Sequence, residues 1–498
     1  MTVFAIACSL GLGALVLRML PHLLAKGDLG VDHWYWKSYI ENYRINRRFP
    51  PQLTQYLLDQ HQWYPPVFPL LVTALPDAVF TRFNQLIAIG IDLLRMSLIL
   101  VVSFWMTGGN TMAMVMAGVI YATIPILVSY NTQLNPRGLG ALALDSALCL
   151  FVWSESLNSP WLIWGIIALL AGGMLLTHKM TTQLFWFLCP SLGLIMGDWR
   201  FFLLIPVSIG VAILMSRGFY LRVLQAHWDI VTFWHRNWRW LQVHPVKESP
   251  LYGEPGFETP TKFYRKGLPG FISHVRYLVG FSPAAWIIVA AAIIAGALSS
   301  GASYQFVVLW GIFCLAFSLL TLFVPFLKCL GSGYFYLYNA AFPVALAGAM
   351  LVRHYPEWAG VLWVGVAGNL VALGLYYRSV AQSKQTRHDG NFDRALEFLK
   401  TARKGTVMCL PLQWSDVVAY KTEQPVLTGG HGYGFKLFEP VFPRVMMPIQ
   451  EVVQKFDVRY LLTKDGYLTE RFHKELCPAE DNRFGDYHVY ITQAKPSV

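Results

Sequence analysis

About eleven apolar segments, each near the length that an α-helix needs to cross a bilayer, recur along residues 1–377. A backbone in lipid must satisfy its own hydrogen bonds, so segments of this kind are predicted to be transmembrane helices. The sequence places them at residues 2–24, 85–106, 111–130, 139–155, 161–177, 181–197, 201–216, 284–301, 304–325, 336–352 and 358–377.

The composition supports the same fold class. Hydrophobic residues make up 55% of the chain and charged residues 13%, and the mean hydropathy is +0.43. Soluble domains carry roughly a quarter of charged residues, and a soluble chain this apolar would lack the polar groups to cover its surface. The sequence therefore predicts a polytopic α-helical membrane protein with residues 1–377 as its transmembrane domain.

Two long loops and a polar tail interrupt the apolar pattern. The loops cover residues 25–84 and 217–282, and residues 378–388 are predicted to be a linker. In the first loop, paired prolines precede a short apolar run, which predicts helices lying in the membrane interface. Residues 389–498 have ordinary polarity and predict a soluble α/β domain.

Within that tail, local patterns predict individual elements. The amphipathic run 392–399 predicts a helix, and the short apolar runs 406–410 and 458–462 predict strands. The tail also contains Cys409 and Cys477, whose spacing does not decide whether they form a disulfide.

The order of helices and loops predicts an asymmetric molecule. With eleven helices, both long loops, the turns at 131–138, 178–180 and 326–335 and the soluble domain share one face. The other face carries only short turns. The net charge of +11 then fits anionic lipid headgroups or a phosphate-bearing substrate better than nucleic acid. The short turns hold too few basic residues to orient the protein by charge.

The most informative stretch is Gly-Val-Asp-His-Trp-Tyr-Trp-Lys-Ser-Tyr-Ile-Glu at residues 30–41. Asp32 follows the first apolar segment and is surrounded by aromatic residues. A partly desolvated carboxylate at the membrane surface can act as a base toward a hydroxyl group. The alternative is that Asp32 caps the amphipathic helix that follows it, and the two roles are compatible.

This stretch, followed by the Tyr64-Pro65-Pro66 segment, resembles the first loop of the GT-C superfamily of membrane glycosyltransferases. The helix and loop layout is similar to that of protein mannosyltransferases, aminoarabinose transferases and oligosaccharyltransferase catalytic subunits. The resemblance covers residues 1–377 in layout, but only the first loop in motif. It implies that Asp32 is the catalytic base and that a polyprenyl-phosphate-linked sugar is the donor. It also implies that the loop-bearing face lies outside the cytoplasm, in a prokaryotic plasma or inner membrane.

Basic residues on the same face are candidates for binding the donor phosphate. Arg137 follows Asn135-Pro136, and a guanidinium pairs well with phosphate oxygens, although snorkelling to lipid headgroups explains it equally. His178 and Lys179 lie in the next turn of this face, where they would stabilise the charge of a departing phosphate. An ordinary interfacial turn is the alternative. The other predicted substrate-binding residues are Lys328, Tyr64 and His33.

A divalent metal is not favoured. The oligosaccharyltransferase branch places a paired-acid motif in the loop that here covers residues 131–138, and this loop has no acid. Glu254 and Glu258 remain as carboxylates in the second long loop, where solvated acids are the simpler interpretation. The sequence therefore favours a metal-independent reaction without a cofactor and leaves a divalent metal as the alternative.

Two further features have less specific interpretations. Asp92 and Arg95 lie one turn apart in an apolar segment and are predicted to pair with each other, whereas Asp145 has no evident partner. The tail contains Gln413-Trp414-Ser415-Asp416 and the Gly-rich run 429–434. The run lacks the Lys-Ser/Thr ending of a phosphate-binding P-loop and predicts a loop over the membrane site.

The sequence thus predicts an inverting sugar transfer to a glycan, lipid or protein acceptor, with membrane lipids as further partners and no nucleic acid. Two alternatives stay open. A transporter or flippase of lipid-linked saccharides would also need many helices, although its typical paired inverted repeats are not evident. A non-catalytic membrane protein of envelope assembly is the other.

Overall fold

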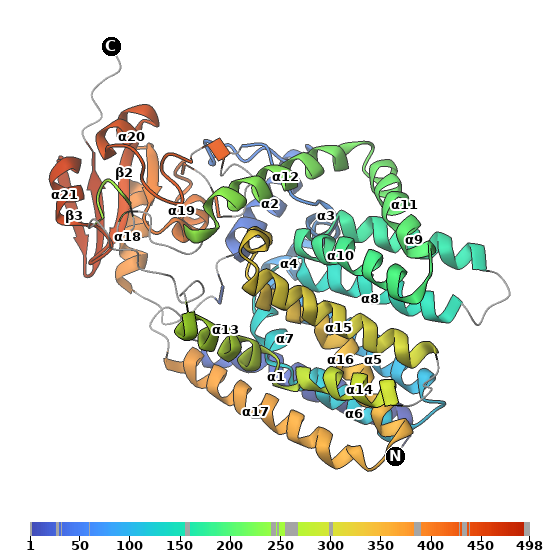
Figure 1. Ribbon diagram of the computed structural model, residues 1–498. Coiled ribbons are helices and arrows are strands. Elements are labelled where there is room, and N and C mark those ends of the chain that lie inside the picture. The colour runs from blue at the N-terminus through green and yellow to red at the C-terminus, as the bar shows by residue number, and fades with distance from the viewer. Residues whose placement is uncertain are drawn as a thin grey trace.

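The computed structural model describes residues 2–25, 29–30, 32–58, 60–154, 160–240, 246, 249–253, 267–297, 302–382, 390–427, 429–430, 436–437 and 439–492. A bundle of long helices forms one part of the molecule, and a smaller domain with a β-sheet forms the other (Figure 1). Glu254, Glu258 and most of the predicted linker and Gly-rich run lie outside the described residues.

The apolar segments form helices close to their predicted positions. They are α1 (Val3–Leu24), α5 (Ile87–Met106), α6 (Thr111–Thr123), α7 (Pro125–Tyr130), α8 (Arg137–Ser154), α9 (Pro160–Leu175), α10 (Lys179–Met196), α11 (Arg200–Met215), α14 (Trp286–Ala297), α15 (Ala302–Phe323), α16 (Leu337–His354) and α17 (Trp358–Gln382).

The predicted number of eleven spans is not confirmed. In the described part of the chain, 6 helical segments are long and apolar enough to cross a membrane, or up to 7 if one pair bent by 91° counts as a single span. One reason is visible at residues 111–130, where Ile124 is extended before Pro125 and divides the segment into α6 and α7. The apolar helices nevertheless agree with a multi-pass membrane protein.

Both long loops contain helices; those of the first loop were predicted from the proline pair and the amphipathic run, whereas those of the second loop were not. The first loop contains α2 (Asp32–Asn46), α3 (Val67–Thr73) and α4 (Asp77–Phe83), and α3 begins directly after Pro66. The second loop contains α12 (Phe219–Asn237) and α13 (Gly267–Phe281). Short 3₁₀ turns η4 (Pro325–Leu330) and η5 (Gly333–Tyr336) connect α15 to α16.

The C-terminal domain is a small α/β unit in which the predicted helix and both predicted strands are present. The order is α18 (Gly390–Thr401), β1 (Thr406–Cys409), α19 (Ser415–Thr422), α20 (Ile449–Lys455), β2 (Val458–Lys464), α21 (Glu470–Leu476), β3 (Glu480–Phe484) and β4 (Tyr487–Ile491). The sheet order is β1-β2-β4-β3, with β1 and β2 parallel and the other pairs antiparallel. Cys409 is buried and Cys477 is exposed, and both are free thiols.

The first loop and the C-terminal domain are joined by backbone hydrogen bonds. Leu57 N donates to Val426 O at 3.0 Å, and Leu58 N donates to Leu427 O at 2.9 Å. Val426 also bridges to Val407 in β1, so residues 55–58 extend the sheet of the C-terminal domain. One hydrophobic core contains side chains from both regions, so the first loop packs directly against the C-terminal domain.

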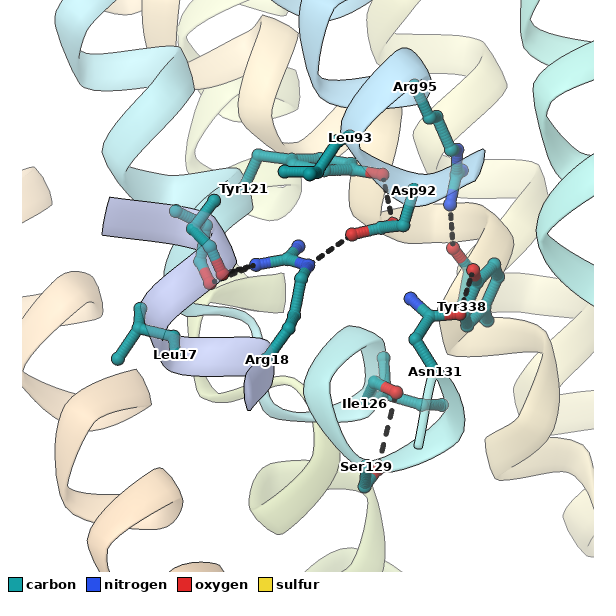
Figure 2. Close-up of polar contacts among 12 residues, drawn as sticks. Leu17, Arg18, Asp92, Leu93, Arg95, Tyr121, Ile126, Ser129, Asn131 and Tyr338 are labelled. Carbon is teal, nitrogen blue, oxygen red and sulfur yellow. Dashed lines mark hydrogen bonds and ion pairs between the residues drawn. The ribbon is translucent and has the colours of Figure 1, made fainter. Parts of the chain in front are cut away.

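Two buried ion pairs join the helices of the bundle, and they correct the predicted Asp92–Arg95 pair. Asp92 on α5 pairs with Arg18 on α1, and Arg95 pairs with Asp145 on α8. Tyr121 Oη donates a further 2.8 Å hydrogen bond to Asp92 Oδ1 (Figure 2). All four charged side chains are fully buried, and charges at that depth need partners in direct contact. Neighbouring helices provide these partners, which a pattern within one helix does not reveal.

Candidate functional site

A cavity of about 370 Å³ lies on the loop-bearing side of the bundle, and we call it the loop-side pocket. It is lined by parts of the chain that are far apart in sequence, including α2, the turn before α8, the start of α10, α12 and η4. All but one of the predicted site residues line it: Asp32, Tyr64, Arg137, His178, Lys179 and Lys328.

His33 is the exception. It is buried, and its ring centre lies 4.2 Å from that of Trp34. Consecutive residues of a helix point about 100° apart because a turn takes 3.6 residues. Asp32 and Trp36, which are one turn apart on α2, therefore both line the pocket, whereas His33 does not.

Asp32 is the first residue of α2, where the partial positive charge of the helix N-terminus favours a carboxylate. Gln133, which also lines the pocket, donates from Nε2 to Asp32 Oδ2 at 3.2 Å. Gln133 Oε1 accepts from Asp32 N at 3.1 Å. The carboxylate is thus held at the pocket wall by a neutral amide from another part of the chain.

Arg137 begins α8 and lies against aromatic rings. Its guanidinium carbon is 4.4 Å from the ring centre of Tyr130 and 4.9 Å from that of Phe335. Asn135 Oδ1 accepts a 3.0 Å hydrogen bond from Arg137 N, which fixes the backbone. The buried Nη1 atom has no hydrogen-bond partner among the described residues. Such a donor is costly unless a ligand or water satisfies it, so Arg137 is well placed to bind an anion.

His178 and Lys179 lie at the start of α10, within the predicted loop-side turn. Burial, together with Arg137 and Lys179, holds the pKa of His178 well below its usual range, so the imidazole is neutral at pH 7. Its Nδ1 accepts from Thr181 N at 3.4 Å and caps the helix. Burial lowers the pKa of Lys179 to about 8, although Asp32 opposes the shift. Lys179 is therefore a cation at pH 7.

Lys328 and Tyr64 complete the wall. The Nζ atom of Lys328 lies 5.1 Å above the ring of Trp238, and partial burial lowers the pKa of this lysine. The ring of Tyr64 packs edge-on against Trp36, with centres 4.8 Å apart. Burial raises the pKa of Tyr64, and Asp32 adds to the shift, so its hydroxyl stays protonated.

The charges of the pocket are unequal. Of the described residues that line it, Asp32 is the only acid, whereas Arg137, Lys179 and Lys328 are basic. The arrangement favours an anionic ligand beside a single carboxylate. The described residues contain no group of three or more His, Cys, Asp or Glu side chains that could hold a metal ion.

Sequence reasoning missed two glutamines of the pocket. Gln133 forms the two hydrogen bonds with Asp32 described above. Gln183 on α10 accepts a 2.7 Å hydrogen bond at Oε1 from Tyr336 Oη, and its Nε2 lies 3.0 Å from Nε2 of His227. Neither side chain is ionisable, so a search for acids, bases and nucleophiles passes over both. The signal that was available is position, since Gln133 lies in the turn predicted to share the face of Asp32.

No family model matches the chain, and no curated protein matches it. Solved structures do resemble it. The apo oligosaccharyltransferase of Archaeoglobus fulgidus has a TM-score of 0.58 at 13% identity, over 93% of this chain and 69% of that one. The same archaeal enzyme, AglB, in complex with an inhibitory peptide and a dolichol-phosphate has a TM-score of 0.58 at 12% identity, with the same coverage.

ArnT from Cupriavidus metallidurans, bound to undecaprenyl phosphate, has a TM-score of 0.56 at 12% identity, over 97% of this chain and 98% of that one. At such identities the likeness shows the fold alone. Both relatives are GT-C enzymes, and the match extends over the helix bundle, the loops and the C-terminal domain. The chain therefore has the fold of the GT-C membrane glycosyltransferases, in agreement with the resemblance of its first loop.

Proposed function

We propose that this protein is a glycosyltransferase that moves a sugar from a polyprenyl-phosphate-linked donor to an acceptor at its loop-bearing, extracytoplasmic face. The observation that carries the proposal is the loop-side pocket, which brings Asp32 together with Arg137, Lys179 and Lys328. AglB and ArnT, which share the fold, were solved with dolichol-phosphate and undecaprenyl phosphate respectively. Both ligands are anionic lipids of the kind that this pocket favours.

The donor phosphate would bind at the basic side of the pocket. Arg137 Nη1, which has no hydrogen-bond partner in the described part of the chain, and the ammonium groups of Lys179 and Lys328 would provide charge-assisted hydrogen bonds to phosphate oxygens. These contacts strengthen as the phosphate leaves, because negative charge then builds up on its oxygens. Aromatic and aliphatic residues of α12, including Ile230 and Trp234, would cover the sugar and exclude water.

The reaction would be an inverting displacement. Asp32 takes the proton of an acceptor hydroxyl, and the acceptor oxygen attacks the anomeric carbon from the side opposite to the phosphate. The bond between the anomeric carbon and the phosphate oxygen breaks, and its electron pair leaves with the polyprenyl phosphate. No step in this scheme requires a metal. The C-terminal domain, which packs on the first loop, would help to bind the acceptor.

The test uses purified protein in liposomes with undecaprenyl-phosphate-linked pentoses and hexoses and a membrane extract as acceptor. The readouts are release of undecaprenyl phosphate and transfer of labelled sugar. Asp32→Asn keeps the size of the side chain and removes the base, so we expect about a 10²–10⁴-fold loss of rate. The matched control is Asp77→Asn, which changes another acid of the first loop with 90% of its side chain exposed.

Full activity of the Asp32→Asn variant would rule out the proposed base. If no sugar is transferred by either form but labelled lipid-linked saccharide crosses the liposome bilayer, the protein is a flippase. If neither transfer nor flipping occurs while partner proteins co-purify with both forms, a non-catalytic role in envelope assembly is favoured.

A further inference from the structure

The side chain of Gln133 contacts Asp32 at two points, using both ends of its amide. Nε2 donates to the carboxylate oxygen Oδ2 at 3.2 Å, and Oε1 accepts from the backbone N of the same residue at 3.1 Å. The two contacts fix which end of the amide faces the carboxylate. They also join the first loop to the turn between α7 and α8, which is 101 residues away in the sequence.

The surrounding backbone is shaped to allow this contact. Gly30 has φ +77°, and a Cβ atom added to it would lie 1.8 Å from Gln133 Oε1. A side chain at position 30 would therefore displace the amide, in addition to straining the backbone. On the other side, Asn135 Nδ2 donates to Gln133 O at 2.9 Å and to Tyr130 O at 2.8 Å.

The turn is also anchored from within the helix bundle. Tyr338 Oη donates to Asn131 Oδ1 at 2.9 Å, and the backbone oxygen of Tyr338 accepts from Arg95 Nη1 at 3.0 Å (Figure 2). Arg95 is itself held by its buried ion pair with Asp145. Gln133 thus extends from a rigid support, which is what a residue that orients another side chain requires.

We infer that Gln133 is a positioning residue for Asp32, which it holds ionised and oriented at the pocket wall. The inference rests on the proposed function, in which Asp32 is the base. A hydrogen bond donated to a carboxylate stabilises its charged form and so lowers its proton affinity. A neutral amide does this without adding charge. Lys179 and Tyr64 are titratable groups whose pKa Asp32 raises, and both are left unchanged in the variants that test the inference.

Two substitutions separate the two contacts. Gln133→Met keeps the length of the side chain and removes both hydrogen bonds. Gln133→Glu keeps an acceptor for Asp32 N but replaces the donor with a second carboxylate. The pKa of Asp32 is expected to rise in the order wild type, Gln133→Met, Gln133→Glu, because like charge adds to the loss of the donor. The first step corresponds to about a tenfold change in proton affinity.

The experiment is infrared titration of the carboxyl C=O stretch in detergent-purified full-length protein, with the Asp32 band assigned by subtraction of an Asp32→Asn spectrum. Gln382→Leu, at an exposed position at the end of α17, is the matched control and should not move the band. Gel filtration and thermal melts establish that each variant is folded. Gln133→Glu remains informative if Gln133→Met does not fold.

The expected order of pKa values supports the inference, and an unmoved Asp32 titration in either folded variant overturns it. The titration does not depend on turnover, so it tests the positioning role of Gln133 separately from the proposed sugar transfer. If transfer is never detected but the order holds, the positioning role stands and the proposed reaction fails. If transfer is detected, the acidic limb of its pH–rate profile must move upward with the Asp32 titration. A drop in rate at all pH values with an unmoved limb would mean a structural role only.

Discussion

Tyr420 Oη on α19 donates a 2.8 Å hydrogen bond to Glu41 Oε1 on α2, although the two residues are 379 positions apart. The same two helices meet through aromatic rings and cations. The ring centre of Trp34 lies 5.2 Å from that of Tyr420, and Lys37 Nζ lies 4.6 Å from the Tyr420 ring centre. The C-terminal domain thus contacts α2, the helix that begins with Asp32. These contacts link the position of the domain to that of the site.

Removing these contacts between α2 and α19 should increase local opening of α2 more than it lowers the stability of the helix bundle. A Trp34→Ala/Tyr420→Phe double variant loses the hydrogen bond to Glu41 and the ring contact, which together are worth about 1–2 kcal/mol. Hydrogen–deuterium exchange should become faster in α2 and α19 and stay unchanged in α16. Equal protection of α2 against exchange in the wild type and the double variant would show that the contacts with α19 are not required to hold α2.

Asp416 should be needed for the junction between the first loop and the C-terminal domain. Its buried carboxylate accepts from Tyr56 Oη at 3.0 Å and from Gly430 N at 3.1 Å. Asp416→Ala leaves these donors unsatisfied, at a cost of about 1–3 kcal/mol. Limited proteolysis should then cleave near residues 55–58 sooner. Asp486→Ala, with 70% of its side chain exposed, is the control and should leave the cleavage rate unchanged.

Removing one partner of a buried ion pair should cost more stability than removing both partners, because a single charge is then left unpaired in an apolar interior. Arg95→Met leaves Asp145 buried without its cation and should cost about 3–5 kcal/mol of folding free energy. The double variant Arg95→Met/Asp145→Leu should recover most of that loss, because no lone charge remains. Thermal melts in detergent measure both. If the double variant is less stable than the single one, the loss is not due to an unpaired charge.

Arg137 should dominate the affinity for the lipid phosphate. Arg137→Met removes the guanidinium that lies over Tyr130 and should weaken undecaprenyl phosphate binding by about 10–100-fold, as expected for a charge-assisted contact. Native mass spectrometry or a tryptophan-quenching titration measures the change. Arg353→Met, at an exposed position at the end of α16, is the control and should bind normally. Undecaprenol, which lacks the phosphate, should bind both proteins equally weakly.

The affinity for undecaprenyl phosphate should fall as the pH rises past 8. The pKa of Lys179 is lowered to about 8 by burial, so this side chain is a cation below pH 8 and neutral above it. The lipid phosphate is already doubly charged there, because its second pKa is about 6. Lys179→Arg keeps its charge up to higher pH and should reduce the decline between pH 7 and 9.5 to the part contributed by Lys328, whose pKa is also lowered by burial. A decline that is the same in Lys179→Arg would assign it to another group.

Much of the fold follows from the sequence alone, because it depends on local patterns. The length and continuity of the apolar segments predict the bundle, and the amphipathic period at 392–399 predicts α18. The position of Asp32 after the first apolar segment, among aromatic residues, makes it a candidate base because a carboxylate there is partly desolvated. The placement of the basic residues at 137, 178–179 and 328 on the face of Asp32 was predicted from the order of helices and loops along the chain.

Only the tertiary structure determines which of these groups contact one another. Arg95 pairs with Asp145 rather than with Asp92, and residues 55–58 join a sheet whose strands begin at residue 406. Gln133 reaches Asp32 across 101 residues. Contacts of this kind depend on how helices pack and turn relative to one another, because a charged group buried in the bundle needs a partner in direct contact. Local periodicity sets the face of one helix, but it contains no information about the partner that a neighbouring helix presents to that face.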